Sequence, residues 1–240
     1  MRPLLGLASF ALLASLSLPA LAGTLSIEGH GEVTAAPDTA YVTSGVTTQG
    51  ATAREALDLN TKAMADLMTE LKASGIAERD VQTSGFSVNP NYVYSEQRDA
   101  NGYSLPPKIN GYQVSNSVTV RVRKLDTLGA ILDKSVTVGA NTINGVSFAV
   151  DDPAELLNQA RKAAFADARA KAELYATAAG TKLDEVKSIS EGQTYNQPPQ
   201  PYMAKAVMAS PVSADVPVAT GELSFAITVS VQWDLEDAGK

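Results

Sequence analysis

The chain has 240 residues, contains no cysteine and carries a formal net charge of −7 at pH 7. The negative charge argues against nucleic acid as a partner, because binding to phosphates requires clustered Lys and Arg. Without cysteine the chain has neither disulfides nor a thiol nucleophile, so its stability must come from burial, for which 45% hydrophobic residues provide ample material.

Residues 1–22 have the features of a secretory signal peptide. Arg2 supplies the positive start, residues 4–18 form an apolar segment too short to span a bilayer comfortably, and Ala20-Leu21-Ala22 is a small-x-small cleavage site. We therefore expect the mature protein to begin near Gly23 and to be exported. No later stretch is long and apolar enough for a membrane-spanning helix, so we expect no transmembrane segment in the mature chain.

The segment 23–108 predicts an N-terminal ββαβ unit. Residues 24–34 and 39–49 are rich in β-branched residues and are interpreted as a hairpin around Pro37. Thr52 and Glu55 form a capping box, after which apolar residues recur at helical spacing until Gly75. A third strand is expected from Val81 to Val88.

The segment 109–240 predicts a C-terminal βαβαββ unit, with a long Pro-rich loop at 191–220. Strict alternation in 112–122 indicates a strand with one wet face, and a second alternating strand is expected at 222–235. The other expected elements are a helix at 126–138, a strand at 142–150, a helix at 153–179 and a strand at 185–190. The longer helix has alanine at every fourth position: Ala160, Ala164, Ala168, Ala172 and Ala176. Alanine at this spacing allows another backbone to approach the helix closely.

These elements predict an α+β fold of two small units, with helices covering antiparallel or mixed sheets. The strand pair 81–94 with 110–123 and the pair 185–194 with 222–235 each follow a helix. Each pair is also joined by a loop rich in Tyr and Pro. We interpret this as a weak internal repeat.

Several segments together resemble the SIMPL-domain proteins of bacterial periplasms. They are Gly29-x-Gly31-Glu32-Val33, Pro37-Asp38 with Ala40 and Val42, the sequence GYQVSNSVTVRVRKLDTLGAILDKSVTVGANTINGVSF, and the sequence KAAFADARAKAELYATAAGTKLDEVKSISEG. That family includes proteins described as oxidative-stress defence proteins and as periplasmic immunogenic proteins. The resemblance implies an α+β fold, residence in the cell envelope and large ring-like oligomers, and it carries over no catalytic residues.

Glu28, His30 and Glu32 form a candidate metal site, because strand alternation places all three on one face. The alternative is a solvated polar face, with Gly29 and Gly31 allowing close backbone approach.

No sequence motif predicts catalysis or a cofactor. The chain has a single His and no common nucleophile motif, so it lacks residues that the common serine and cysteine hydrolase mechanisms require. Asp38, Asp151, Asp152 and Glu155 could in principle act as paired carboxylates. Turn chemistry at Asp38 and a helix start near the other three explain them structurally. We therefore expect no enzymatic activity and no cofactor.

Five of the eight tyrosines lie in the two Pro-rich loops and are candidate interaction residues: Tyr92, Tyr94, Tyr103, Tyr195 and Tyr202. Tyrosine adds a large amphipathic contact area at low entropic cost. The sequence therefore predicts an exported, non-enzymatic protein that forms a homo-oligomer and contributes to envelope or oxidative stress tolerance. The alternative is a periplasmic binding module whose Tyr-rich loops hold an envelope ligand such as a peptide, glycan or small molecule.

Overall fold

The computed structural model describes residues 23–192 and 216–237, and within these ranges it contains seven strands and three α-helices. Their order is the predicted ββαβ followed by βαβαββ, which confirms the α+β class. The elements, with two short 3₁₀ helices η1 and η2, are β1 (Thr24–Ala35), β2 (Thr39–Gly50), α1 (Ala53–Ala73), η1 (Glu78–Asp80), β3 (Val81–Val93), β4 (Lys108–Val122), η2 (Leu125–Thr127), α2 (Leu128–Thr137), β5 (Thr142–Ala149), α3 (Ala154–Ala178), β6 (Thr181–Glu191) and β7 (Leu223–Asp237).

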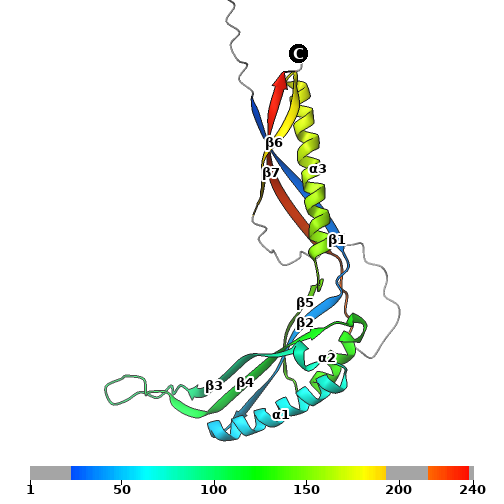
Figure 1. Cartoon of the computed structure of the whole chain (residues 1–240). Coiled ribbons are helices and arrows are strands. Elements are labelled where there is room, and N and C mark those ends of the chain that lie inside the picture. Colours follow the sequence, from blue (N-terminus) through cyan, green and yellow to red (C-terminus); the bar gives the residue numbers. More distant parts are fainter. Residues whose placement is uncertain (1–22, 193–215, 238–240) are drawn as a thin grey trace, which may run out of the picture.

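The strands form two antiparallel sheets, which lie at opposite ends of an elongated molecule (Figure 1). One sheet has the strand order β1-β7-β6 and is covered by α3. The other has the order β3-β4-β2-β5 and packs against α1, which also contacts α2. Among the described residues, no helix is both long and apolar enough to cross a membrane.

The expected hairpin between residues 24–34 and 39–49 is wrong, because the two strands belong to different sheets. β1 pairs along its whole length with β7, whereas β2 pairs with β4 and β5. Turn residues around Pro37 indicate where a strand ends but do not determine which strand it pairs with. Residues 36–38 are therefore a connection from one sheet to the other.

The two sheets also do not divide the chain at residue 108. β4 begins at Lys108 and pairs with β3, so strands on both sides of the expected boundary share a sheet. β1, from the start of the chain, joins β6 and β7 from its end. Local patterns could not reveal this grouping, since partners such as Thr24 and Asp234 are far apart in sequence.

Both sheets contain the same connection of strand, helix, strand and strand. In one sheet β1, α3, β6 and β7 follow in this order and β7 lies in the middle. In the other, β2, α1, β3 and β4 follow and β4 lies between β2 and β3. The expected strand pairs of the internal repeat are β3 with β4 and β6 with β7, both antiparallel. One βαββ unit is thus inserted, with β5 and α2, between β1 and α3 of the other.

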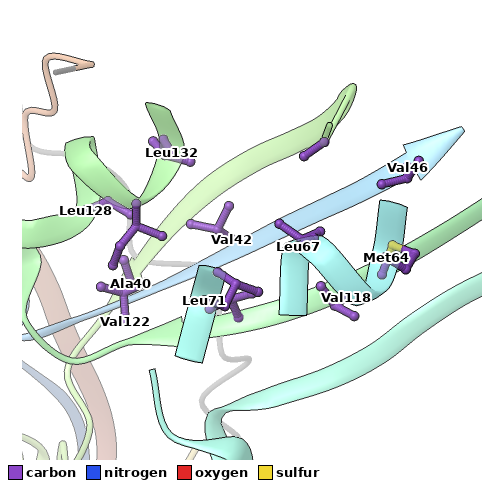
Figure 2. Packing of buried hydrophobic residues seen from close by; sticks show 13 residues of the cluster. Ala40, Val42, Val46, Met64, Leu67, Leu71, Val118, Val122, Leu128 and Leu132 are labelled. Carbon is purple, nitrogen blue, oxygen red and sulfur yellow. The ribbon is translucent and has the colours of Figure 1, made fainter. Parts of the chain in front are cut away.

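The core of the four-stranded sheet lies between its strands β2 and β4 and the helices α1 and α2 (Figure 2). The predicted cap of α1 is confirmed, since Thr52 Oγ1 accepts a hydrogen bond of 3.2 Å from the Glu55 N–H. Asn60, buried among apolar residues, donates its side-chain amide to the Val46 carbonyl at 2.8 Å. Figure 2 labels ten residues of this core: Ala40, Val42, Val46, Met64, Leu67, Leu71, Val118, Val122, Leu128 and Leu132.

The second core is formed by the alanine face of α3 on the three-stranded sheet. All five alanines of the predicted stripe are buried. Ala160, Ala164 and Ala168 lie on Gly29 and Gly31 of β1, where a Cβ atom on either glycine would come within about 2 Å of an α3 backbone carbonyl oxygen. The helix and the strand are therefore in direct backbone contact, as alanine at that spacing allows.

Candidate functional site

The outer halves of β3 and β4 and their connection form an arm, defined here as residues 86–116, which extends beyond α1 (Figure 1). Three of the predicted interaction residues lie in it. Tyr92 is 51% exposed, Tyr94 76% and Tyr103 73%. All three rings are thus available for contact with another molecule.

The end of the arm is organised by its own hydrogen bonds. Asp99 Oδ1 accepts from the backbone N–H groups of Asn101 and Tyr103, each at 2.9 Å. Gly102 has a φ of +84°, which a glycine adopts without strain, and Arg98 donates to its carbonyl at 2.8 Å. This turn holds Tyr103 at the tip.

Four further large apolar side chains of the arm are exposed, and sequence reasoning missed them: Phe86, Val88, Val93 and Ile109. Phe86 and Val88 pair with Asn116 and Val114, so they point to the sheet face that carries α1. A helix about 10 Å wide covers about two strands spaced about 4.8 Å apart. Because α1 lies mainly on β2 and β4, the edge strand β3 remains partly uncovered. The sequence did contain a signal for this exposure, because it predicts one long helix to cover a sheet of more than two strands.

Tyr195 and Tyr202, the other two candidate interaction residues, lie outside the described ranges, as does most of the Pro-rich loop 191–220. The signal-peptide segment 1–22 lies outside them as well.

Glu28, His30 and Glu32 are all exposed on β1, on the face opposite to Gly29 and Gly31. Two of the three side chains contact β7: Ser224 Oγ donates a hydrogen bond to the Glu32 carboxylate, and His30 Nδ1 lies 3.4 Å from Thr228 Oγ1. The described residues contain no group of three His, Cys, Asp or Glu that could hold a metal ion. The geometry thus agrees with a hydrogen-bonded polar strand face.

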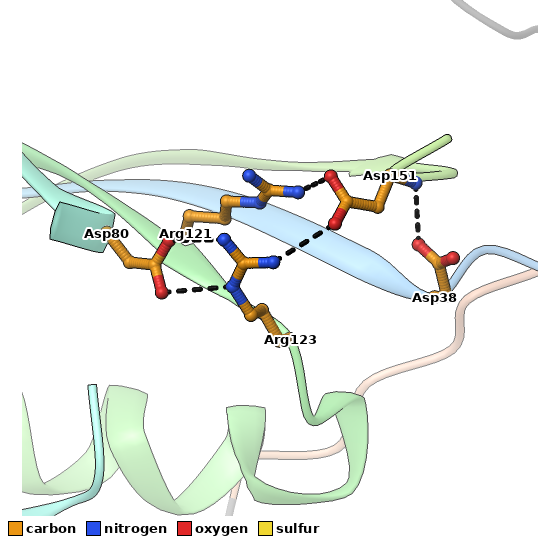
Figure 3. Close-up of polar contacts among 5 residues, drawn as sticks. All are labelled: Asp38, Asp80, Arg121, Arg123 and Asp151. Carbon is orange, nitrogen blue, oxygen red and sulfur yellow. Dashed lines mark hydrogen bonds and ion pairs between the residues drawn. The ribbon is translucent and has the colours of Figure 1, made fainter. Parts of the chain in front are cut away.

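A polar cluster that the sequence did not predict joins Arg121 of β4 and Arg123, which directly follows β4, to two carboxylates, and a third carboxylate, that of Asp38, is attached through a backbone N–H (Figure 3). Arg123 bonds to both oxygens of Asp80, at 3.0 and 2.8 Å, and to Asp151 at 3.0 Å. Arg121 also pairs with Asp151, whose own N–H donates to Asp38 Oδ1 at 2.8 Å. Asp38 and Asp151 lie in the two connections that lead between the sheets, so the cluster joins both connections to β4.

The hydrogen bond from Arg123 holds the pKa of Asp80 below its ordinary value, against the opposing effect of burial. A carboxyl group held ionised in this way is poorly suited to donate a proton near neutral pH. These contacts agree with a structural role, and not a catalytic one, for the carboxylates of Asp38 and Asp151. Their partners, however, are arginines and a backbone N–H across the fold, which turn and helix-start patterns do not reveal.

Comparison with known sequences identifies the family. The profile of the SIMPL family, described as a protein of unknown function (DUF541), matches residues 25–233. The chain belongs to the SIMPL family. The matched region of this SIMPL protein includes the whole of β2 to β6 and the arm, together with most of β1 and β7.

Two named relatives cover most of this SIMPL protein. It is 39% identical over 239 residues to the 26 kDa periplasmic immunogenic protein of Brucella melitensis, covering 94% of this chain and 93% of the relative. It is 31% identical over 209 residues to the uncharacterized protein YggE of Escherichia coli, covering 87% of this chain and 81% of the relative. Neither name describes an enzymatic activity.

Proposed function

We propose that this SIMPL protein is exported to the periplasm, assembles with copies of itself through the β3–β4 arm, and contributes without catalysis to envelope or oxidative stress tolerance. The location is supported by the periplasmic relative and by the signal-peptide features of residues 1–22. The stress role is supported by the family resemblance.

The observation that carries the assembly is the concentration of exposed apolar side chains on the arm. Seven large apolar residues there are each at least 39% exposed: Phe86, Val88, Tyr92, Val93, Tyr94, Tyr103 and Ile109. Exposed apolar surface of this kind marks interaction sites in folded proteins, and tyrosine is enriched at protein interfaces. The hydrogen bonds to Asp99 fix the backbone at Tyr103, which lowers the entropic cost of ordering this residue in a contact.

Shortening the arm tests this proposal. Val93 and Lys108 are direct partners in the β3–β4 ladder, so an Asn-Gly turn can replace residues 94–107 without changing the register. We expect the shortened protein to lose mass in light scattering relative to the full chain, because it lacks Tyr94 and Tyr103. Tyr175→Ser, which removes from α3 a tyrosine that is 58% exposed, is the control and should leave the mass unchanged.

The same variant tests the link to stress tolerance in cells. A deletion strain should be more sensitive to peroxide, and full-length protein recovered in the periplasmic fraction should restore growth. The shortened protein, present at the same level in that fraction, should restore it less well. If the shortened protein has the mass of the full chain in light scattering, assembly through the arm is refuted. If its mass is reduced but it fully restores growth, stress tolerance does not depend on assembly.

A further inference from the structure

The two sheets and their helices form two lobes with separate hydrophobic cores. The three-stranded lobe is defined here as β1, α3, β6 and β7, and the four-stranded lobe as β2 to β5 with α1 and α2. The two clusters of buried apolar side chains share no residue, and the extensive packing between elements lies within one lobe or the other. The lobes lie at opposite ends of the molecule (Figure 1). The angle between them is therefore not fixed by a shared apolar core.

Three short segments join the lobes. Residues 36–37 and 152–153 belong to the two connections that lead between the sheets. Residues 219–222 link Val218, which packs against the four-stranded core, to β7. The first two segments each end in a proline, which fixes one of their few backbone dihedrals. Hinges between protein domains are short stretches of this kind, in which a few residues absorb the change in φ and ψ.

The polar cluster of Figure 3 lies where two of these segments enter the four-stranded lobe. Asp38 directly follows the first segment and Asp151 directly precedes the second, and the Asp151 N–H donates to Asp38 Oδ1 at 2.8 Å. The Asp151 carboxylate pairs with Arg121 and Arg123. The two connections are thus bound to each other and to the end of β4.

The two arginines are held in place by other residues of the four-stranded lobe. Arg123 donates to both carboxylate oxygens of Asp80. The Arg121 side chain is 22% exposed, and its guanidinium carbon lies 5.9 Å from the centre of the Tyr41 ring. Neither arginine therefore depends on Asp151 alone for its position. They form a preorganised site to which the carboxylate of Asp151 attaches, and this attachment is the contact that can open.

We propose that the three segments form a hinge between the lobes, and that the ion pairs of Asp151 with Arg121 and Arg123 are its lock. With the lock closed, rotation is confined to the few residues of the hinge. With the lock open, Asp151 also moves, and the lobes adopt a wider range of angles. The Asp151 side chain is 41% exposed, so dissolved salt screens its ion pairs. The angle between the lobes thus responds to ionic strength.

Distances measured across the hinge test this proposal. The chain contains no cysteine, so Ala65→Cys on α1 and Ala166→Cys on α3 place one spin label on each lobe, both at exposed positions. Pulsed electron paramagnetic resonance, with the labelled protein diluted into unlabelled protein, gives the distribution of distances within one copy. Asp151→Asn and Arg121→Gln should each broaden this distribution, because the ratio of locked to unlocked molecules falls about tenfold.

Salt tests the lock without any substitution in it. The Debye length falls from about 10 Å at 0.1 M salt to about 3 Å at 1 M. The distribution of distances across the hinge should therefore broaden between these two concentrations of NaCl in the protein that keeps Asp151 and Arg121. This comparison remains valid if a variant of the lock does not fold.

Two controls separate rotation at the hinge from general loosening. Labels at Ala65→Cys and Ser147→Cys both lie on the four-stranded lobe, and their distance distribution should stay the same in every variant and at both salt concentrations. Arg161→Gln breaks a two-bond ion pair with Glu191 inside the three-stranded lobe. It should leave the distribution across the hinge unchanged.

Two results would overturn the proposal. One is a distribution across the hinge that stays equally narrow in the lock variants and at 1 M NaCl, since the lobes would then be held without the lock. The other is a distribution that is already as broad at 0.1 M NaCl in the protein with an intact lock, since the ion pairs would then not restrict the hinge. The arm-shortened protein keeps both lobes and should give the same results, so this proposal and assembly through the arm can fail separately.

Discussion

Asp80 is a buried carboxylate whose environment makes a testable contribution to stability. Its side chain is 6% exposed and accepts two hydrogen bonds from the guanidinium of Arg123. Bidentate bonds of this kind are among the stronger polar interactions in proteins. They fix η1 to the end of β4 and lower the pKa of Asp80.

Asp80→Asn should lower the free energy of unfolding near pH 7 by about 1–2 kcal/mol, because the charge-assisted bonds from Arg123 are lost. Since the pKa of Asp80 is lower in the folded than in the unfolded protein, its stabilisation is complete above about pH 4. It is lost as the pH falls through the folded value. Urea unfolding of both proteins across this range should therefore give curves of stability that converge at acid pH.

The control for this prediction is Asp58→Asn, which breaks an exposed pair with Arg54 on α1. Exposed pairs contribute little, so this variant should match the original protein at every pH. A difference between Asp80→Asn and the original protein that persists unchanged at acid pH would mean that ionisation of Asp80 is not the cause.

At the scale of single elements, β1 is an edge strand whose free backbone groups are covered by α3. The His30 N–H donates to Asp167 Oδ2 at 2.8 Å, and Lys171 Nζ donates to the Glu28 carbonyl at 3.2 Å. Asp167 and Lys171 also pair with each other, and this bond lowers the pKa of Asp167 more than the His30 bond does. Covered donors and acceptors hinder the addition of another strand at this edge.

Gly29→Ala should separate α3 from β1. The added Cβ would lie 2.0 Å from the Ala164 carbonyl oxygen and 2.6 Å from the Ala168 Cβ, so the helix must shift. Overpacking of this kind costs about 1–3 kcal/mol, which thermal unfolding monitored by circular dichroism should detect.

Gly23→Ala, next to the start of the same strand, is the matched control for this prediction. Its Cβ would meet only the Leu235 side chain at 3.7 Å, which is an ordinary contact, so its effect should be small. Equal melting temperatures for the two variants would contradict the backbone contact between α3 and β1.

At the scale of the whole molecule, the sequence predicts what is local and misses what is distant. The class, the element order, the α1 cap and the buried alanine face of α3 follow from spacings within one element. The pairing of β1 with β7 depends on residues such as Thr24 and Asp234, which no local pattern connects. The exposed tyrosines of the arm follow from loop composition, whereas the exposure of Phe86 depends on how much sheet one helix covers.

The nested arrangement of the two units makes them unequal in their ability to fold alone. Residues 38–152 are continuous and contain β2 to β5, α1 and α2. They also contain the five residues of the polar cluster. The other sheet needs two distant segments, because β1 comes from residues 24–35 and its partners from the end of the chain.

A fragment of residues 38–152 should therefore fold cooperatively, with sigmoidal urea unfolding and dispersed amide resonances. Its stability should be lower than that of the whole chain, since Val218 packs against this core from outside the fragment. Residues 154–237 alone are the comparison. Without β1, α3 loses its contact with Gly29 and Gly31, and β7, paired only with β6, becomes an edge strand, so we expect no cooperative transition. Cooperative folding of residues 154–237 without β1, or its absence in residues 38–152, would show that the nested strand order does not determine which part of the chain is autonomous.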